Sequence, residues 1–213
     1  MKMFGIIGYG SFIISSIMLN LTPGSDTIYV LTRAAIGGRR KGIISALGIS
    51  TGILIHTVLV ALGLSVILEK SVLAFNIVKL AGAAYLIFLG IKAIISRKSL
   101  FSADDAKGDI SGFAVYRQGV LTNVLNPKTA LFFLALLPQF VSEDNAYGAL
   151  PFLLLGLTFF TTSTIWSVFL AFIASYANRF LLKNEKVHGI AGKITGVIYI
   201  LLGVNVLRAK IGA

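Results

Sequence analysis

A carboxylate, Asp26, lies inside an apolar stretch and is the first side chain that could do chemistry. It follows residues 20–25 (Asn-Leu-Thr-Pro-Gly-Ser) within a hydrophobic run from about residue 4 to 31. A charge inside a bilayer is costly and usually marks a pathway for an ion, a proton or a substrate. Asp26 could therefore bind a substrate ammonium or carry a coupling proton. In the structural alternative, Asp26 or Ser25 caps a helix that restarts after Gly24.

Lys128 is the corresponding base in a second apolar stretch, directly after Asn126 and Pro127. A lysine near the end of a span often extends to the lipid headgroups, but the apolar residues on both sides make that harder here. Lys128 could instead pair with Asp26 or receive a substrate carboxylate. The sequence leaves these three alternatives open.

Both charges stand beside helix-breaking residues. Pro23 and Pro127 each remove a backbone donor and clash with the preceding turn, and Gly24 adds backbone freedom. Broken backbone inside a bilayer is tolerated only where protein or a water-filled cavity surrounds it. The amides at the restarted helix ends favour an anion. A zwitterion would find complementary partners here, with helix starts or Lys128 for its carboxylate and Asp26 for its ammonium.

Neutral polar side chains accompany the breaks. Asn20, Asn123 and Asn126 could satisfy backbone groups that the breaks set free, or contact a ligand. His56, in the next apolar stretch, is either a hydrogen-bonded core residue or a proton relay. The candidate residues for binding substrate or proton are Asn20, Pro23, Gly24, Ser25, Asp26, His56, Asn126, Pro127 and Lys128.

Small residues indicate where helices pack closely. Gly48 and Gly52 are one helical turn apart, a spacing that suits close helix approach within the monomer or in a homodimer. Ser and Thr residues recur between 158 and 167 and favour helix packing, although one face of that helix could line a cavity.

The composition is that of a polytopic membrane protein. Of the 213 residues, 56% are hydrophobic and only 13% are charged, with a mean hydropathy of +0.90, whereas soluble domains carry about 25% charged residues. The net charge of +11 fits cytoplasmic loops rich in Lys and Arg better than nucleic-acid binding. No cysteine is present, which excludes disulfides and cysteine-bound metals. The first apolar run is too long for a cleavable signal, so we expect a true span there.

We predict six membrane spans in an all-α fold. Their approximate limits are 4–31, 42–68, 72–95, 116–141, 147–176 and 190–207. The connection at 32–41 reads as a tight basic turn. The first, third and fifth connections with their flanks hold 13 of the 19 Lys and Arg residues, against five on the other side. This bias predicts that the odd loops are cytoplasmic and that both termini lie outside.

Two pairs of matching segments indicate an internal repeat. The spacing Lys-x-x-Gly-x-x-Tyr from Lys79 recurs from Lys193, and the Asn and Pro residues of the first break recur in the fourth span. Because each repeat holds three spans, the second copy must insert upside down, as in secondary transporters that bind substrate near the midplane. The expected architecture is one transmembrane domain, 1–213, with halves at about 1–95 and 113–213 joined by the polar loop 96–112.

No catalytic constellation is recognised, so we predict a protein that is not an enzyme and needs no cofactor. The sequence lacks His-Glu-x-x-His and the phosphate-binding Gly-x-x-x-x-Gly-Lys-[Ser/Thr], which argues against direct ATP use. Two other classes stay open. One is an intramembrane enzyme that uses Asp26 with His56, and the other is a membrane scaffold or subunit without transport activity.

Two segments together resemble the signatures of a known family. Residues 21–31 (Leu-Thr-Pro-Gly-Ser-Asp-Thr-Ile-Tyr-Val-Leu), followed by Arg33 and the glycine- and arginine-rich 37–42, look like the first signature of the LysE/RhtB exporters. Residues 126–133 (Asn-Pro-Lys-Thr-Ala-Leu-Phe-Phe) and 137–140 (Leu-Pro-Gln-Phe) are similar to the second. The likeness extends over essentially the whole chain, in length and span pattern as well.

The resemblance implies an exporter of amino acids or their derivatives in a bacterial inner membrane, which exchanges its substrate for protons. Where the family more often has Pro-Gly-Pro-Asp, this chain has Ser25, which changes the break but leaves Asp26 in place. The substrate does not carry over, because members export cationic, neutral or hydroxylated amino acids. Without a second intramembrane acid, a neutral or hydroxylated amino acid (homoserine- or threonine-like) is favoured over a basic, lysine-like one.

Overall fold

The computed structural model describes residues 4–70 and 110–176 continuously, together with isolated positions within 77–95 and 193–204. All regular elements in these residues are helices, and the single β-bridge joins Ile6 to Val141. The all-α prediction is confirmed for this part of the chain. The predicted third and sixth spans and most of the 96–112 loop lie outside the continuously described residues.

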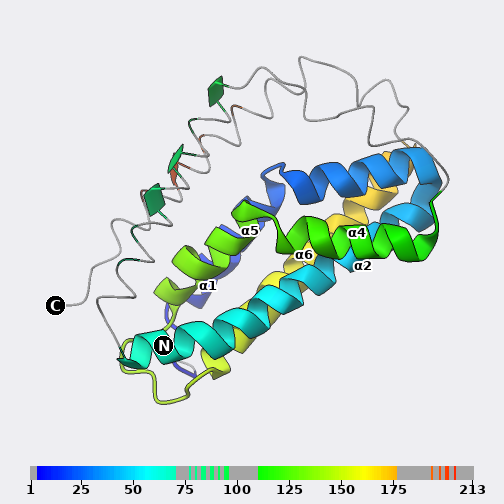
Figure 1. The fold of residues 1–213 in the computed structure, drawn as a ribbon. Coiled ribbons are helices and arrows are strands. Elements are labelled where there is room, and N and C mark those ends of the chain that lie inside the picture. Colours follow the sequence, from blue (N-terminus) through cyan, green and yellow to red (C-terminus); the bar gives the residue numbers. More distant parts are fainter. Residues whose placement is uncertain are drawn as a thin grey trace.

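Within these residues five α-helices and two short irregular helices follow one another (Figure 1). They are α1 (Tyr9–Leu21), α2 (Ser25–Lys70), α4 (Gly112–Val124), α5 (Pro127–Leu131), the π-helix η2 (Phe132–Leu136), the 3-10 helix η3 (Leu137–Phe140) and α6 (Leu150–Tyr176). The first helix begins later than the predicted residue 4. The helix of the fourth span begins earlier than predicted, because the Ser111 side chain caps α4 by accepting from the Ala114 amide.

Two arms joined at Gly38 make up α2. Gly38 adopts φ 73° and ψ 178°, and residues with a side chain rarely adopt such a positive φ. The chain reverses there, and the second arm runs back from the turn (Figure 1). A turn does lie within the basic connection predicted at 32–41, but it is confined to Gly38: residues 32–37 still belong to the first arm, and Arg39, Arg40 and Lys41 begin the second.

Several of these helices are long and apolar enough to cross a membrane. Ser25–Gly63 and Leu150–Ser175 meet this test, and the pair Gly112–Val124 and Pro127–Phe140, bent by 46°, meets it as one unit. The described residues therefore hold two candidate spans, or three if the bent pair is one span. The 39 residues of Ser25–Gly63 would extend about 58 Å as a straight helix. A bilayer core is only about 30 Å thick. The stretch is not one straight helix, because the turn at Gly38 divides it into two arms.

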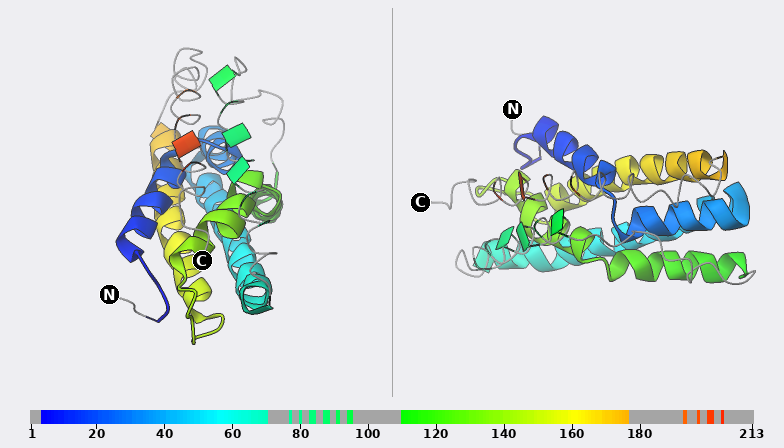
Figure 2. Two further views of the ribbon diagram at one scale, coloured as in Figure 1. Left: turned by 90° about the vertical axis from the view of Figure 1, so that its left-hand side faces the viewer. Right: turned by 90° about the horizontal axis from the view of Figure 1, so that it is seen from above.

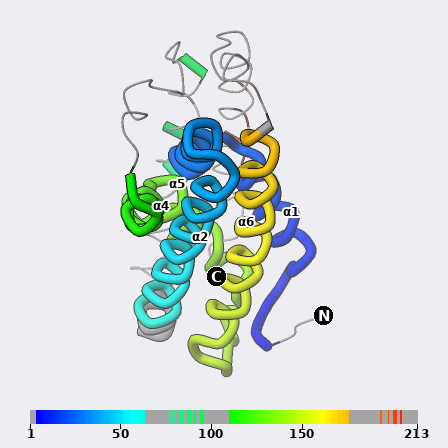
Figure 3. The backbone as a smooth tube through the Cα atoms, turned by 90° about the vertical axis from the view of Figure 1, so that its right-hand side faces the viewer, coloured from blue at the N-terminus to red at the C-terminus, as the bar shows by residue number. Residues whose placement is uncertain are grey.

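The centre of the bundle is α2, which packs along both α4 and α6 (Figure 3). A Cβ atom on Gly48 would collide with the Tyr116 carbonyl oxygen and lie 3.1 Å from Gly119 Cα. A Cβ atom on Gly52 would lie 2.6 Å from the Asn123 side chain. Gly48 and Gly52 thus allow close approach of α2 and α4 within one chain.

Ser50, between these two glycines, completes a Gly-x-Ser-x-Gly pattern that in hydrolases marks an exposed nucleophile at a strand-to-helix turn. Here Ser50 lies in mid-helix and is buried. Its hydroxyl donates to the Ala46 carbonyl at 2.9 Å and lies 2.7 Å from Thr164 Oγ1. The structure therefore assigns Ser50 to the packing of α2 on α6.

The two ends of the bundle carry different connections (Figure 2). At one end the Ile7 amide donates to the Phe140 carbonyl at 2.9 Å. At the other end the Arg39 guanidinium lies 4.5 Å from the centre of the Phe172 ring, so the basic turn meets the last turns of α6. The N-terminal segment and the fourth connection therefore share one end, and the first connection shares the other end with the end of α6.

Gly48 and Gly63 offer a matched test of the packing. Alanine at Gly63, where a Cβ would meet no described atom within 4 Å, should raise the unfolding free energy by up to about 1 kcal/mol, because alanine favours a helix. Alanine at Gly48 should instead lower it by about 1–3 kcal/mol, because the added Cβ forces α2 away from α4. Thermal unfolding of both variants in one detergent measures the difference. Equal stabilisation by the two substitutions would contradict close packing at Gly48.

Candidate functional site

The first helix break leaves a backbone carbonyl without its helical partner. At this break α1 ends at Leu21, Thr22 is extended (φ −73°, ψ 115°), and α2 begins at Ser25. In an unbroken helix the Thr22 carbonyl would accept from the amide four residues later, but Pro23 interrupts the helix. Thr22 is fully buried, so its carbonyl needs a partner from elsewhere in the protein.

The second break is capped by its own asparagine. After α4 ends at Val124, the Asn126 side chain accepts from the Lys128 amide at 3.0 Å, with Pro127 in the first turn of α5. Proline suits this position because the N–H that it lacks would be unpaired at a helix start. The helical segments before and after the break meet at 46°.

Lys128 joins the two breaks. Its ammonium donates to the Thr22 carbonyl at 2.6 Å, so a cation stands at the C-terminal end of α1, where the helix dipole favours it. The Lys128 residue is only 9% exposed. A Cβ atom on Gly24 would lie 3.2 Å from Lys128 Cδ, so Gly24 leaves room for this side chain. Lys128 thus extends into the protein, toward the first break.

Asp26 makes the reciprocal link. Its Oδ2 accepts from Asn123 Nδ2 at 2.7 Å and from Thr129 Oγ1 at 3.4 Å, and both partners belong to the second broken region. In the first turn of α2 the carboxylate also stands near free backbone amides, whose partial positive charge favours it. The two charged side chains therefore each bind the opposite break.

His56 reaches the same region from the second arm of α2. Its Nε2 lies 3.3 Å from the Asn123 carbonyl oxygen, and its ring stacks on Phe133 with centroids 5.6 Å apart. Asn123 is fully buried. Its side chain contacts Asp26 and its carbonyl contacts His56, so Asn123 connects these two titratable groups.

Unpaired polar atoms gather in this cluster. Of the five buried side-chain atoms without a hydrogen-bond partner in the described residues, three are here: Asp26 Oδ1, Asn123 Oδ1 and Asn126 Nδ2. Most buried polar groups in proteins are paired, so an unpaired group calls for a physical reason. The Asn126 side chain lies beside Asp26, so its donor and the Asp26 acceptor are complementary to each other. Together with the Asn123 acceptor they are also the complement of a small ligand that carries both donors and acceptors.

Not all of the predicted residues meet in this cluster. Asn20 donates from Nδ2 to Thr162 Oγ1 in α6 at 3.2 Å, apart from the bonds that join the breaks. Ser25 is exposed and lines a neighbouring cleft. Thr22 and Thr129, which bind the two charged side chains, are missing from the prediction. Their position next to predicted residues was the only signal for them.

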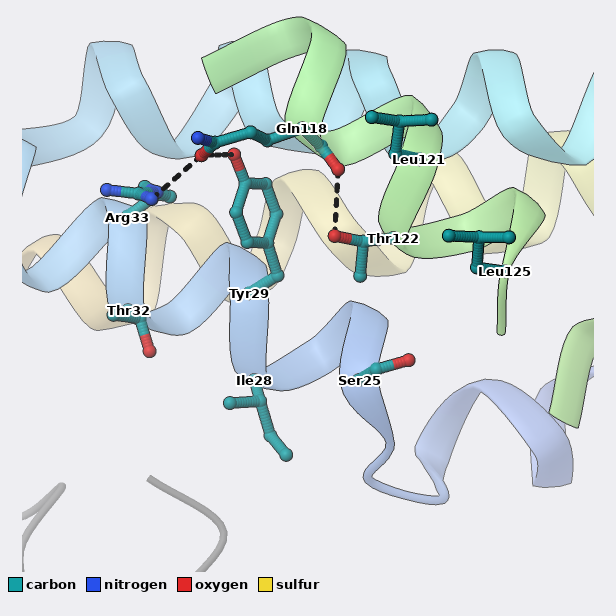
Figure 4. A pocket seen from close by; sticks show the side chains of 9 residues that line it. All are labelled: Ser25, Ile28, Tyr29, Thr32, Arg33, Gln118, Leu121, Thr122 and Leu125. Carbon is teal, nitrogen blue, oxygen red and sulfur yellow. Dashed lines mark hydrogen bonds between the residues drawn. The ribbon is translucent and has the colours of Figure 1, made fainter. Parts of the chain in front are cut away.

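A cleft of about 620 Å³ adjoins the breaks, between the first arm of α2 and α4 (Figure 4). Ser25 and Leu125, which flank the two breaks, line one end, and Arg33 lines the other. The volume falls within the range of about 300–1,000 Å³ that is usual for small-molecule sites. In the described part of the chain, no three His, Cys, Asp or Glu side chains gather where they could hold a metal ion.

The bundle contains apolar helices long enough to span a bilayer. Inside it, an acid from one break and a base from the other each bind a neutral group of the opposite break. These features define a helical membrane protein with a polar interior site. Sequence comparison gives this class a name. The chain belongs to the LysE type translocator family, whose sequence model matches residues 17–210. The family resemblance of the two signatures is thereby confirmed.

Several relatives are similar over most of the chain. A homoserine/homoserine lactone efflux protein of Salmonella typhimurium is 33% identical over 202 residues, 94% of this chain and 96% of the relative. The membrane protein YrhP of Bacillus subtilis is 36% identical over 197 residues, 88% of this chain and 92% of the relative. A membrane protein of Vibrio cholerae is 30% identical over 200 residues, covering 94% and 96%. No solved structure matches the chain.

Replacing Lys128 by methionine tests the link between the breaks. Methionine keeps a long side chain but removes the donor, which leaves the buried Thr22 carbonyl unpaired and should cost about 1–3 kcal/mol of unfolding free energy. Arg117→Met, at an exposed position on α4, is the matched control and should change stability by less than about 0.5 kcal/mol. Thermal unfolding in detergent measures both. If Lys128→Met melts at the same temperature as Arg117→Met, the bond from Lys128 to Thr22 contributes nothing to stability.

Proposed function

We propose that this protein exports a zwitterionic amino acid, or a close derivative, through the site between the two breaks. The observation that carries the proposal is the cluster of unpaired atoms beside two opposite charges: the acceptors Asp26 Oδ1 and Asn123 Oδ1 and the donor Asn126 Nδ2. A substrate ammonium would donate to the acceptors, and a substrate carboxylate would accept from the donor. Membership of a translocator family and the efflux relative support transport as the activity.

In the proposed binding mode each end of the substrate meets a complementary group. The ammonium donates to Asp26 Oδ1, and the carboxylate lies near the start of α5, where free amides favour an anion. Lys128 can contribute to carboxylate binding without releasing Thr22, because its ammonium has three donors and the carbonyl takes only one.

We favour a neutral or hydroxylated amino acid, such as homoserine or threonine, as the substrate. The relative from Salmonella typhimurium is named as a homoserine/homoserine lactone efflux protein. A lactone would keep the ammonium contact and lose the carboxylate contact. Among the described residues, Asp26 is the only carboxylate in the cluster, so the second ammonium of a lysine-like substrate would have no acid to pair with. A lysine-like substrate is the alternative.

Proton antiport would complete the transport cycle. The amino acid binds the charged form of Asp26 from the cytoplasm and leaves on the other side, where Asp26 takes up a proton and resets the carrier. The proposed framework is a single domain, 1–213, of six spans in a 3+3 inverted repeat, with halves at about 1–95 and 113–213. The two broken helices would then occupy equivalent positions in the two halves.

The proposed orientation in the cell inner membrane has the odd loops in the cytoplasm and both termini outside. The described residues support it through their charges. The bundle end where α6 finishes is basic, with Arg39, Arg40 and Lys41. The opposite end, where the N-terminal segment binds Phe140, is acidic and carries Glu143 and Asp144. Basic residues are enriched on the cytoplasmic side of membrane proteins.

The Asp26→Asn variant separates the two roles of the carboxylate. It should lose efflux driven by a pH gradient by about tenfold or more, because it removes both the proton site and a charge-assisted hydrogen bond. Counterflow of labelled amino acid without a pH gradient should persist if Asp26 carries only the proton, and should fall as well if it binds the ammonium. Glu143→Gln, at an exposed acid, is the control. Full efflux with an unchanged pH dependence would overturn the mechanism.

Single cysteines test the orientation, because the chain has no cysteine of its own. Glu143→Cys should react with a membrane-impermeant thiol reagent added to the outer face of the inner membrane. Arg40→Cys should react only after the membrane has been permeabilised. Both positions are exposed, so the reagent can reach either one on its own side. The reverse labelling pattern would show that the protein is inserted the other way.

A further inference from the structure

The cleft between the first arm of α2 and α4 contains a cation that lies apart from the cluster at the breaks. Its lining, drawn in Figure 4, combines apolar side chains and hydroxyl groups with one amide, Gln118, and one guanidinium, Arg33. The lining residues in the described part of the chain include no carboxylate. A cleft with apolar walls, a few polar groups and a single cation suits a small organic ligand that carries an anionic group.

Two neutral neighbours hold the Arg33 guanidinium against the cleft wall. Its Nη2 donates to Gln118 Oε1 at 2.9 Å, and its central carbon lies 5.3 Å from the centre of the Tyr29 ring. The Tyr29 hydroxyl donates to the Val115 carbonyl at 2.7 Å, which fixes the ring between the two helices. Arg33 Nε is buried and has no hydrogen-bond partner among the residues that the structure describes. The guanidinium is therefore positioned by its neighbours, and part of its hydrogen-bonding capacity is unused.

The helical spacing of Arg33 and Asp26 is too wide for one α-amino acid to bind both side chains at the same time. They are seven residues apart on one face of the first arm of α2, with Tyr29 between them. Seven helical residues rise by about 10 Å. The ammonium and carboxylate of an α-amino acid are attached to one carbon atom, so they cannot contact both residues at once. The spacing indicates two separate positions, one at Arg33 inside the cleft and one at Asp26, next to Ser25 at the end of the cleft.

We propose that Arg33 is a first binding position for the substrate carboxylate, occupied before the substrate ammonium reaches Asp26. This inference rests on the proposed export function. Guanidinium and carboxylate form paired, charge-assisted hydrogen bonds, and Tyr29 and Gln118 act as positioning residues for the guanidinium. The position therefore distinguishes an amino acid from its amide, which keeps the ammonium and the side chain but lacks the carboxylate.

Competition in proteoliposomes tests this position. Counterflow of a labelled amino acid is inhibited with the unlabelled acid and, separately, with its amide. The wild-type protein should be inhibited by the acid at a concentration at least about tenfold lower than by the amide. Arg33→Gln should raise the inhibitory concentration of the acid by about 10- to 100-fold and leave that of the amide unchanged, so that only the preference due to the start of α5 and Lys128 remains.

Matched variants separate this role from charge and from folding. Arg40→Gln removes the same charge from an exposed position outside the cleft lining and should keep the preference. Arg33→Lys keeps the charge but loses the planar fork, so the preference should fall by less than in Arg33→Gln. Gln118→Leu frees the guanidinium and should also reduce the preference. These last two variants test the position even if Arg33→Gln does not fold.

Several results would overturn the proposal. One is a wild-type protein without preference for the acid, and another is an Arg33→Gln variant that loses inhibition by acid and amide equally. An effect of Arg33→Gln that appears only in vesicles with anionic lipid would assign Arg33 to a lipid phosphate. Absence of counterflow with every amino acid tested would mean that the export function itself fails, and this outcome is recognised from the wild-type protein alone.

Discussion

The arrangement of this protein depends on the bond from the Lys128 ammonium to the Thr22 carbonyl. A helix broken inside a bilayer exposes backbone groups that water does not reach, and each unpaired group costs several kcal/mol. Here each break supplies what the other lacks. Lys128 crosses from the second break to the first, at 2.6 Å from the Thr22 carbonyl, while the Asp26 carboxylate accepts from Asn123 of the second broken region at 2.7 Å. The two links run in opposite directions, so neither broken helix can shift without disturbing the other.

Close packing on one side and an open cleft on the other surround this pair of links. Gly24 and Gly52 have no side chains, which lets Lys128 and Asn123 approach α2. Behind them the Phe132 and Phe159 rings lie with centroids 4.3 Å apart, in an apolar wall that excludes water. Because the interior is apolar, the hydrogen bonds of the two charged side chains are stronger than they would be in water, and losing a partner costs more. The cleft ends at Ser25 and Leu125 beside the breaks, and in the proposed function a polar ligand would approach the charged groups from there.

The sequence was sufficient for the elements that depend on composition and helix-breaking residues. The two breaks at Pro23 and Pro127 and the basic turn are all found near their predicted positions. The pairing of Lys128 was beyond sequence reasoning, because its partner is a main-chain carbonyl, and patterns of side chains do not reveal such acceptors. The predicted first span ends at residue 31, which would place Arg33 in a loop, whereas α2 stays helical up to the turn at Gly38. The repeat itself depends on spans outside the continuously described residues and stays a prediction.

The links between the breaks also explain why a zwitterion, rather than a simple ion, would shift the conformational equilibrium in the proposed transport cycle. A ligand shifts a conformational equilibrium only if it interacts differently with the two states. In the proposed cycle a substrate ammonium at Asp26 Oδ1 offsets the charge of the carboxylate and so weakens its bond from Asn123. A substrate carboxylate beside Lys128 likewise weakens the bond from the ammonium to the Thr22 carbonyl. A cation alone would weaken one link and an anion alone the other, and the remaining link would still hold the breaks together. Only a molecule with both groups loosens both links at once, so substrate occupancy and movement of the broken helices become coupled.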